Sequence, residues 1–509
     1  MGDRDGYELI IVGAGSTGCT LAARLSEDPS RRVALVEAGP DFGAGEGFPP
    51  EVRGAQAIGA WMPGYVNSWN FVGRISEASP EYPMARGRLV GGSSAINGTV
   101  FARGNRGDFD NWAAGGNDLW SWDRVLPFYI GAERDLNFDG DLHGTGGPMI
   151  VDRPLFDEAR DISEAFAEAC VSAGFAEKAD KNAPGPGGVG PIPRNVDGET
   201  RLNVAMAYLT PEVRARPNLT VIAGTYVRRV LIEGGRAVGI EAEGVEGPLT
   251  LSAEEVVLSA GALKSPQLLM LSGIGPEASL RAAGVEVLHD RPGLGTAVKD
   301  HPTVFAAVHI DDGPELPEGI VMCHNGLDFT APGSEQESDC EITWGKMADT
   351  LNLNAVLGLE RSCGTISLAS ADPAEPPRID LNYLSDPADL PTLVAAVRVA
   401  LGILSSAELG AMNVDPFDLP AAGAADDELG AWVTANVASS LHTHNSTPMG
   451  PASDPLAVVD QHCRVHGVEG LRVADVGIVP AIRTGPAATA VMIGERLAAL
   501  MSTTGGTDE

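Results

Sequence analysis

The sequence predicts an α/β fold that is divided into at least two domains. At 509 residues, the chain is too long for one small hydrophobic core. Near the N-terminus, residues 8–41 read as a short apolar strand, a glycine-rich turn, a helix and a second strand. Residues 255–276 again give a strand, a turn of small residues and an apolar helix. Strands that alternate with helices are typical of a parallel sheet covered by helices.

The composition indicates a globular protein and argues against some partners. Hydrophobic residues make up 44% of the chain and charged residues 20%, as in ordinary globular enzymes. The net charge of −34 would repel nucleic acid and anionic lipid. Six scattered cysteines without CxxC pairing argue against a zinc ribbon or a disulfide framework and suit a reducing compartment. We therefore expect a cytoplasmic protein with no nucleic-acid partner.

The sequence predicts neither a signal peptide nor a membrane span. The N-terminal apolar run is short and leads directly into a glycine-rich motif. No run of about 18 apolar residues occurs, so we expect no integral membrane segment. The polar tail at 504–509 is expected to be frayed.

The N-terminal glycine motif predicts a dinucleotide site. Strand residues 9–12 lead into GAGSTG, which fits G-x-G-x-x-G with Gly13, Gly15 and Gly18. The first glycine permits the tight turn, the second lets the backbone approach a pyrophosphate, and the third lets the helix sit close to the strand. Glu37 lies 19 residues past Gly18, where a carboxylate is expected to bind ribose hydroxyls. Both NAD and FAD use this unit, so the motif alone leaves the cofactor open.

Four further segments carry a resemblance to one family. They are the glycine- and serine-rich loop 86–109, the strand–turn–helix unit 255–276, PGLGTAVKDHP at 292–302 and LRVADVGIVP at 471–480. In this order they resemble the signature segments of the glucose–methanol–choline (GMC) oxidoreductases, from about residue 8 to residue 503. The resemblance implies FAD as the cofactor and oxidation of an alcohol by hydride transfer to flavin N5.

The resemblance also implies a two-domain organisation. We expect a Rossmann-like FAD-binding domain assembled from residues 1–152, 196–303 and 440–503. The remaining residues, 153–195 and 304–439, are expected to form an α+β substrate domain built on an antiparallel sheet. Within it, residues 365–383 alternate apolar and polar side chains around a Pro-rich turn, which indicates strands. Residues 387–405 have the apolar spacing of a helix.

Several residues are expected to hold FAD because they match the family's motifs. The ADP half would be held by Gly13, Ala14, Gly15, Gly18, Glu37 and Ala38. The flavin would be lined by Val90, Gly91, Asn97, Gly98, Thr99 and Val100. The adenine would meet Val227, and the other expected contacts are Ala260, Asp475, Val476 and Ala487. Ile96 occupies the position where some relatives attach FAD through a histidine, so we expect noncovalent FAD.

The segment ATAVMIGERLAALMS at 488–502 predicts a buried helix. It is apolar on nearly all sides. The resemblance implies that the N-terminus of this helix points at the pyrimidine edge of the flavin. A helix N-terminus carries roughly half a positive charge, which would stabilise an anionic reduced flavin.

The stretch SLHTHNSTPMG at 440–450 holds the candidate base. No acid or cysteine lies nearby, which argues against a metal site, and we expect no metal. Counting back from Met449, the family's histidine falls on His442, while Asn445 takes the place of the usual glycine. An imidazole can accept the hydroxyl proton of an alcohol near neutral pH. We therefore expect His442 to be the base and the rate to rise through a pKa of roughly 6 to 8.

A second catalytic position is vacant in the sequence. Counting back from MIGE at 492–495 places the family's usual second His or Asn at Ala487, or at Ala488 if the gap is shifted by one residue, and either way the residue is alanine. The partner role is then either vacant or filled by Asn445 or His444.

Three classes of function remain open at this point. They are an FAD-dependent alcohol dehydrogenase or oxidase, which the resemblance favours, a non-redox flavoprotein lyase, and a binding protein with vestigial FAD. The segment 483–496 is similar to the mycofactocin-associated branch of the family, which implies a peptide-derived carrier as substrate and a respiratory acceptor. The sequence does not identify the small-molecule alcohol or decide whether oxygen, a quinone or a carrier accepts the electrons.

Overall fold

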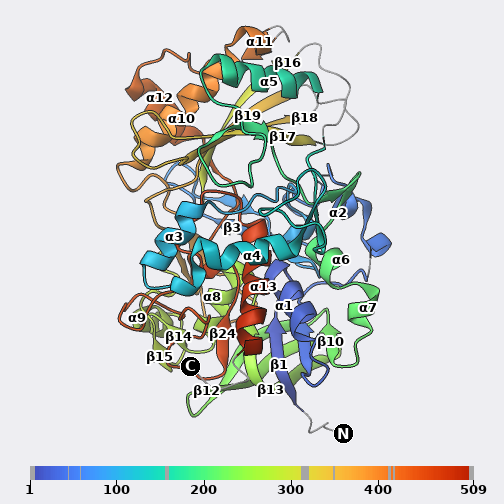
Figure 1. Ribbon diagram of the computed structural model, residues 1–509. Helices are drawn as coiled ribbons and strands as arrows, with labels where there is room; N and C mark the ends of the chain where they lie inside the picture. Colours follow the sequence, from blue (N-terminus) through green and yellow to red (C-terminus); the bar gives the residue numbers. More distant parts are fainter. Residues whose placement is uncertain are drawn as a thin grey trace.

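Two seven-stranded sheets organise the protein, one in the lower and one in the upper half of the view in Figure 1. The computed structural model describes residues 6–43, 45–57, 59–154, 160–310, 320–347, 350–410, 414–416 and 419–503. The predicted tail at 504–509 lies outside the described residues. Among the described helices, none combines the length and the apolar character that crossing a membrane requires.

The first sheet is parallel at its centre and antiparallel at one edge. Its order is β10 (Leu219–Ile222), β2 (Val33–Val36), β1 (Tyr7–Val12), β13 (Gly247–Leu258), β12 (Arg236–Gly244) and β11 (Tyr226–Glu233), with β24 (Leu471–Val473) beside β13. β13 pairs antiparallel with β12 near its start and parallel with β1 and β24 near its end. The apolar run at 9–12 is therefore confirmed as a central strand of a parallel, Rossmann-like unit.

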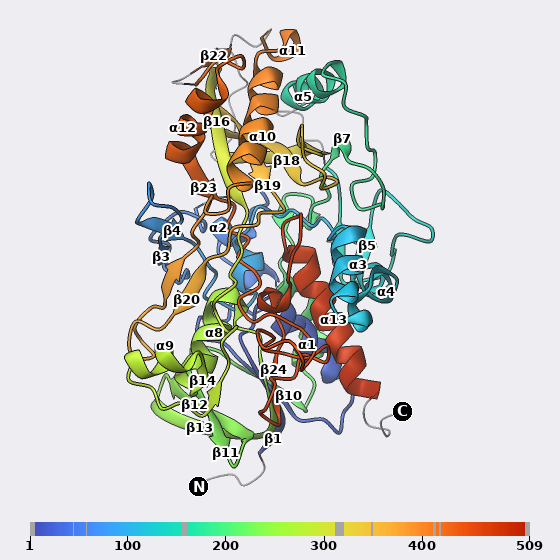
Figure 2. The same ribbon diagram turned by 90° about the vertical axis from the view of Figure 1, so that its left-hand side faces the viewer.

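Helices α1 (Ser16–Leu25) and α13 (Ala487–Thr503) lie side by side against this sheet (Figures 1 and 2). The Thr17 hydroxyl donates to the Ala490 carbonyl at 2.7 Å, and Arg24 pairs with Glu495 at 2.8 Å. The predicted helix at 488–502 is thus confirmed. Together with α1 it forms one layer of helices against the first sheet, although the two helices are far apart in the sequence.

The second sheet is antiparallel throughout, as predicted. Its order is β22 (Val414–Pro416), β16 (Pro302–Ile310), β19 (Thr350–Leu357), β18 (Cys340–Met347), β17 (Ile320–Phe329) and β7 (Gly188–Pro191), with β23 (Val437–Ser439) beside β16. The predicted helix at 387–405 is α10 (Asp389–Leu404), which packs on this sheet beside α12 (Asp426–Asn436) (Figure 2). β16 begins at Pro302, two residues before the expected domain boundary, and the boundaries themselves stay a prediction.

Smaller elements complete the structure around the two sheets. The segment 365–383 contains the antiparallel pair β20 (Thr365–Ser367) and β21 (Arg378–Asp380), as its alternation predicted. The remaining strands are β3 (Phe71–Gly73), β4 (Tyr82–Met84), β5 (Glu133–Asp135), β6 (Met149–Val151), β8 (Val196–Asp197), β9 (Thr200–Arg201), β14 (Ile274–Gly275) and β15 (His289–Asp290). The remaining helices are α2 (Pro50–Arg53), α3 (Arg106–Ala114), α4 (Trp122–Ala132), α5 (Arg160–Ser172), α6 (Val204–Tyr208), α7 (Pro211–Arg214), α8 (Gly261–Leu271), α9 (Glu277–Ala282) and α11 (Ala407–Gly410).

The glycine-rich segment 86–109 is less irregular than its composition suggests. It contains a short 3-10 helix at Gly92–Ala95, and α3 begins within it at Arg106. The helix starts there because the Asn105 side chain accepts a hydrogen bond from the Gly107 N–H at 2.9 Å and so caps the first turn.

Candidate active site

A cavity of about 410 Å³ is lined by residues of both large sheets. The predicted site residues that line it are Gly13, Gly15, Glu37, Ala38, Asn97, Gly98, Val100, Val227, Ala260, His442, Asp475, Val476 and Ala487. They come from segments that are far apart in the sequence, so the fold gathers the predicted motifs around one space. The other wall includes side chains from β16, β18 and β19.

The glycines of the N-terminal motif have separate steric roles. Gly13 has φ of 101°, and a side-chain carbon there would lie 2.5 Å from the Ser259 carbonyl oxygen. At Gly18 the same atom would lie 1.9 Å from the Gly13 carbonyl oxygen, so the helix can approach the strand only without a side chain. At Gly15, which lines the cavity, no described atom lies within 4 Å of that position. The open space at Gly15, beside the start of α1, fits a pyrophosphate.

Glu37 lies at the end of β2 with its carboxylate fixed in place. One oxygen accepts from the Ala14 N–H at 3.0 Å and the other from the Gly39 N–H at 2.9 Å. Burial raises the pKa of Glu37 to about 7, although these backbone donors oppose the shift. Each carboxylate oxygen retains acceptor capacity beside the cavity, which fits the ribose hydroxyls of FAD.

The other predicted cofactor residues support the cavity from behind. Five predicted residues are not among the described residues that line the cavity: Ala14, Gly18, Val90, Gly91 and Thr99. The Gly91 N–H donates to the Ala14 carbonyl at 2.8 Å, which ties the second glycine-rich loop to the first. The Thr99 hydroxyl accepts from Arg194 at 2.8 Å. These residues therefore fix the shape of the site without facing the space inside it.

His442 lines the cavity on a loop that Asp300 holds. One Asp300 oxygen accepts from the His442 N–H at 2.8 Å. The other accepts from the hydroxyls of Thr443 at 2.7 Å and Ser439 at 3.2 Å. The loop is thus fixed by a buried carboxylate that uses both of its oxygens.

A hydrogen-bonded pair of imidazoles sets the tautomer of His442. His301 Nε2 lies 2.6 Å from the Ile482 carbonyl oxygen, which can only accept, so that nitrogen carries the hydrogen. In neutral His301, Nδ1 is then an acceptor. It lies 3.0 Å from His442 Nδ1, which must be the donor. His442 Nε2 is therefore left without a hydrogen.

The pKa values of both rings support this assignment. Burial lowers the pKa of His301 to about 4. Burial also lowers the pKa of His442 well below its usual value, and repulsion from Arg86, and from His301 whenever that ring is protonated, adds to the shift. His442 is thus a neutral acceptor at physiological pH, with a pKa shifted downward from its usual value.

Sequence reasoning missed His301. It belongs to the DHP triplet of the 292–302 segment, which was used only as a family marker. The triplet supplies both the Asp300 support and the imidazole partner. The signal that could have revealed His301 was its place next to Asp300 within that family segment.

The two other catalytic candidates lie behind the His442 loop. His444 is 1% exposed, and its Nδ1 lies 3.0 Å from the His442 carbonyl oxygen. The Asn445 amide donates to the Ala297 carbonyl at 2.9 Å. In the described structure neither residue lines the cavity, so their catalytic role stays a prediction without a contact to support it.

The residue that faces His442 ahead of α13 is Gly485. A side-chain carbon at Gly485 would lie 3.2 Å from His442 Nε2. Ala487, the position that counting along the sequence selected, lines the cavity as the first residue of α13. The space directly in front of the base is therefore open because residue 485 has no side chain.

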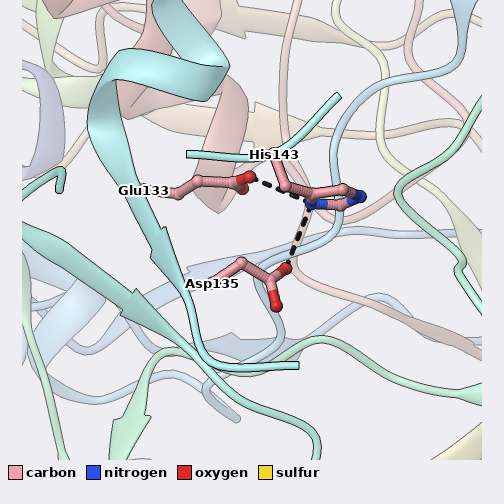
Figure 3. Close-up of side chains that lie close together, drawn as sticks. All are labelled: Glu133, Asp135 and His143. Carbon is pink, nitrogen blue, oxygen red and sulfur yellow. Dashed lines mark hydrogen bonds and ion pairs between the residues drawn. The ribbon is translucent and has the colours of Figure 1, made fainter. Parts of the chain in front are cut away.

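A buried cluster of Glu133, Asp135 and His143 resembles a metal centre in composition (Figure 3). His143 Nδ1 lies 3.1 Å from Glu133 and 3.2 Å from Asp135, and Nε2 lies 2.8 Å from Asp180. Burial lowers the pKa of His143, but the three carboxylates outweigh it and raise the pKa to about 10. A protonated imidazole has no lone pair for a metal.

The cluster is instead balanced by arginines. Arg103 pairs with Glu133, and Arg153 pairs with Asp135 at 2.8 Å. Asp180 lies in the segment between α5 and β7, so the ion pairs connect that segment to β5. This arrangement indicates a structural role.

The known proteins that resemble the chain settle its family. The GMC oxidoreductase family models match residues 7–303 and residues 360–494. The chain belongs to the GMC oxidoreductase family. It is therefore a flavoprotein oxidoreductase that uses FAD, and the predicted cofactor and fold are confirmed.

Individual relatives cover almost the whole length of this GMC oxidoreductase. The 5-(hydroxymethyl)furfural oxidase of Methylovorus sp. is 33% identical over 94% of this chain and 95% of its own. The oxygen-dependent choline dehydrogenase of Brucella anthropi is 32% identical over 96% of this chain and 94% of its own. The crystal structure of pyridoxine 4-oxidase from Mesorbium loti has a TM-score of 0.88 and 29% identity, and covers 98% of this chain and 99% of its own.

We expect the FAD of this GMC oxidoreductase to be released by acid or heat. Ile96 is buried and lines the cavity, and its hydrocarbon side chain offers no atom for a covalent bond to the flavin. The measurement is the visible absorbance of the supernatant and of the pellet after acid precipitation. Yellow colour that stays with the precipitated chain would contradict noncovalent binding.

Proposed function

We propose that this GMC oxidoreductase oxidises a small alcohol and that His442 accepts the hydroxyl proton. The observation that carries the proposal is the tautomer imposed by His301, which leaves His442 Nε2 unprotonated beside the open space at Gly485. The relatives named as alcohol-oxidising enzymes support the substrate class. Bound FAD supplies the hydride acceptor.

The chain's own residues prepare the proton transfer. Asp300 holds the loop, so His442 does not need to reorient when the substrate binds. His301 accepts a hydrogen bond from the Nδ1–H of His442. This bond stabilises the positive charge that develops on the His442 ring as Nε2 takes the proton. Since Gly485 contributes no side chain, His442 is the polar group placed to contact the substrate oxygen from this side.

The reaction class can be tested by adding alcohols to the purified enzyme without oxygen. An alcohol dehydrogenase or oxidase is expected to lose its visible flavin absorbance on addition of a substrate. A non-redox lyase would convert its substrate with no bleaching, and a protein with vestigial FAD would show neither change. Re-oxidation of the bleached enzyme by air, by a quinone or by a carrier then identifies the electron acceptor.

His301→Ala is expected to slow anaerobic flavin reduction about tenfold. Without its acceptor, His442 loses one hydrogen bond worth about 0.5–1.5 kcal/mol, and its hydrogen can move to Nε2, which is then no longer a base. FAD content should be unchanged. His301→Gln, whose amide oxygen can accept from Nδ1, should recover part of the rate. Equal rates in the Ala and Gln variants would argue that the ring only fills space.

A further inference from the structure

The substrate-domain sheet presents an ordered grid of side chains to the cavity. In β16, β19 and β18, Thr303 lies opposite Val356, which lies opposite Glu341. Two residues further along the face, Phe305 lies opposite Asn354, which lies opposite Thr343. All six line the cavity. Because alternate residues of a strand share one face, these two rows form one continuous wall.

The wall extends from the base toward Glu341. Thr303 follows His301 by two residues and so anchors the first row beside the His301–His442 pair. Neighbouring strands lie about 4.8 Å apart, so the Glu341 backbone lies roughly 10 Å from that of Thr303. A substrate held at His442 therefore reaches Glu341 only with a group several bonds away from the oxidised carbon.

Glu341 differs from the neighbouring carboxylates because it forms no ion pair among the described residues. Lys181 pairs with Asp328 at 2.6 Å, Arg103 pairs with Glu133, and Arg483 pairs with Asp108. Among the described residues, no hydrogen bond or ion pair engages the Glu341 carboxyl. Burial raises the pKa of Glu341 to about 7; Asp328 adds to the shift and Lys181 opposes it.

Asn354 adds a second acceptor to the same wall. Its amide nitrogen donates to the Thr343 hydroxyl at 3.2 Å. The carbonyl oxygen of the same amide is buried and has no hydrogen-bond partner in the described structure. A buried acceptor without a donor is costly, and a ligand N–H would relieve that cost.

We propose that this wall is a subsite for a cationic nitrogen, so that the enzyme prefers alcohols carrying an ammonium group several bonds from the carbinol. The ammonium N–H groups would donate to the Glu341 carboxylate and to the Asn354 carbonyl oxygen. The net charge of −34 favours the approach of a cation. The inference rests on the proposed function for the placement of the carbinol at His442.

Binding of the cation is expected to depend on the ionisation of Glu341. Above its pKa the carboxylate is charged and attracts the ammonium, and below it the attraction is lost. The charged groups that surround Glu341 are Asp328 of β17, Lys178 and Lys181 ahead of β7, Arg103 and Arg106 near the start of α3, and Arg483 ahead of α13.

The test compares two alcohols of similar shape on the holoenzyme. The flavin is first reduced chemically without oxygen, so that neither alcohol is consumed, and binding is followed by titration calorimetry. We expect 4-(aminomethyl)benzyl alcohol to bind at least about tenfold more tightly than 4-methylbenzyl alcohol at about pH 8, with a smaller difference at about pH 6. This comparison needs no variant.

Glu341→Gln should remove the preference, because the amide keeps the shape of the side chain and loses its charge. Glu335→Gln is the matched control: it removes an equal charge from an exposed position and should keep the preference. Equal affinities in the wild type, or a preference that survives in Glu341→Gln, would overturn the subsite. The proposed function is tested separately, on the oxidised enzyme: no bleaching by any alcohol of the anaerobic screen would refute it, while a preference measured on the reduced enzyme would leave the subsite intact.

Discussion

His442→Ala is expected to slow anaerobic flavin reduction by about 10²–10⁴-fold, the usual contribution of a positioned acid–base group. The expected loss follows from geometry, since His442 Nε2 faces the cavity without a hydrogen while Asp300 and His301 hold the loop and the ring. FAD content should stay normal, because the glycine motif and Glu37 are unaffected. The measurement is stopped-flow absorbance with a substrate found in the alcohol screen.

The control is the neighbouring imidazole. His444→Ala removes a ring that lies behind the loop, and it should alter the rate far less than His442→Ala. If His444→Ala reduces its flavin as slowly as His442→Ala does, His444 also takes part in catalysis, as the sequence analysis allowed. If His442→Ala reduces its flavin at the wild-type rate, the proton acceptor is a different residue.

The pH dependence gives an independent reading of the same residue. Because the pKa of His442 lies well below its usual value, the ring stays neutral as pH falls toward that lower value. The wild-type rate of reduction should therefore be constant through the neutral range and decrease only at distinctly acidic pH. The His442 variant should lack this acidic decrease.

Gly15→Ala is expected to weaken FAD binding by about 10- to 100-fold while leaving the stability of the apoprotein nearly unchanged. The added methyl group would meet no described atom within 4 Å, so the empty fold tolerates it. It would enter the cavity where the pyrophosphate is expected, and such crowding costs about 1–3 kcal/mol. FAD affinity is measured by fluorescence titration of the apoprotein, and stability by thermal unfolding.

Gly18→Ala provides the contrasting variant. Its methyl group would lie 1.9 Å from the Gly13 carbonyl oxygen, so it should destabilise the apoprotein as well as the complex. Gly131→Ala, in α4, adds a methyl group with no described atom within 4 Å and lies outside the cavity lining, so it should change neither quantity. Unaltered FAD affinity in Gly15→Ala would remove this turn from the pyrophosphate site.

The nucleotide site was predictable because its signals are local. The strand, the glycines of the turn and the helix occupy consecutive positions, and the steric need for Gly13 and Gly18 arises within that unit. His442 was predictable from its distance to Met449 along one loop. The placement of Glu37 at the end of β2 follows from the same short pattern.

The partner of His442 and the substrate wall were not predictable in this way. His301 and His442 are 141 residues apart and meet only because β16 and β23 pair. Glu341 faces the cavity because of the strand register, and a shift of one residue would turn it to the other side. Counting back along the chain selected Ala487, whereas it is Gly485 that the turn ahead of α13 directs at the base.

The contact between α1 and α13 also has a consequence for how the protein is made. Thr17 and Ala490 are hydrogen-bonded although 473 residues separate them. At a synthesis rate of about 5–20 residues per second, the ribosome needs roughly 25–95 s to add the partner helix after α1 has been made. During that interval the face of α1 that packs on α13, which includes Thr17 and Thr20, has no partner helix. The layer formed by α1 and α13 can therefore be completed only after α13 has left the ribosome.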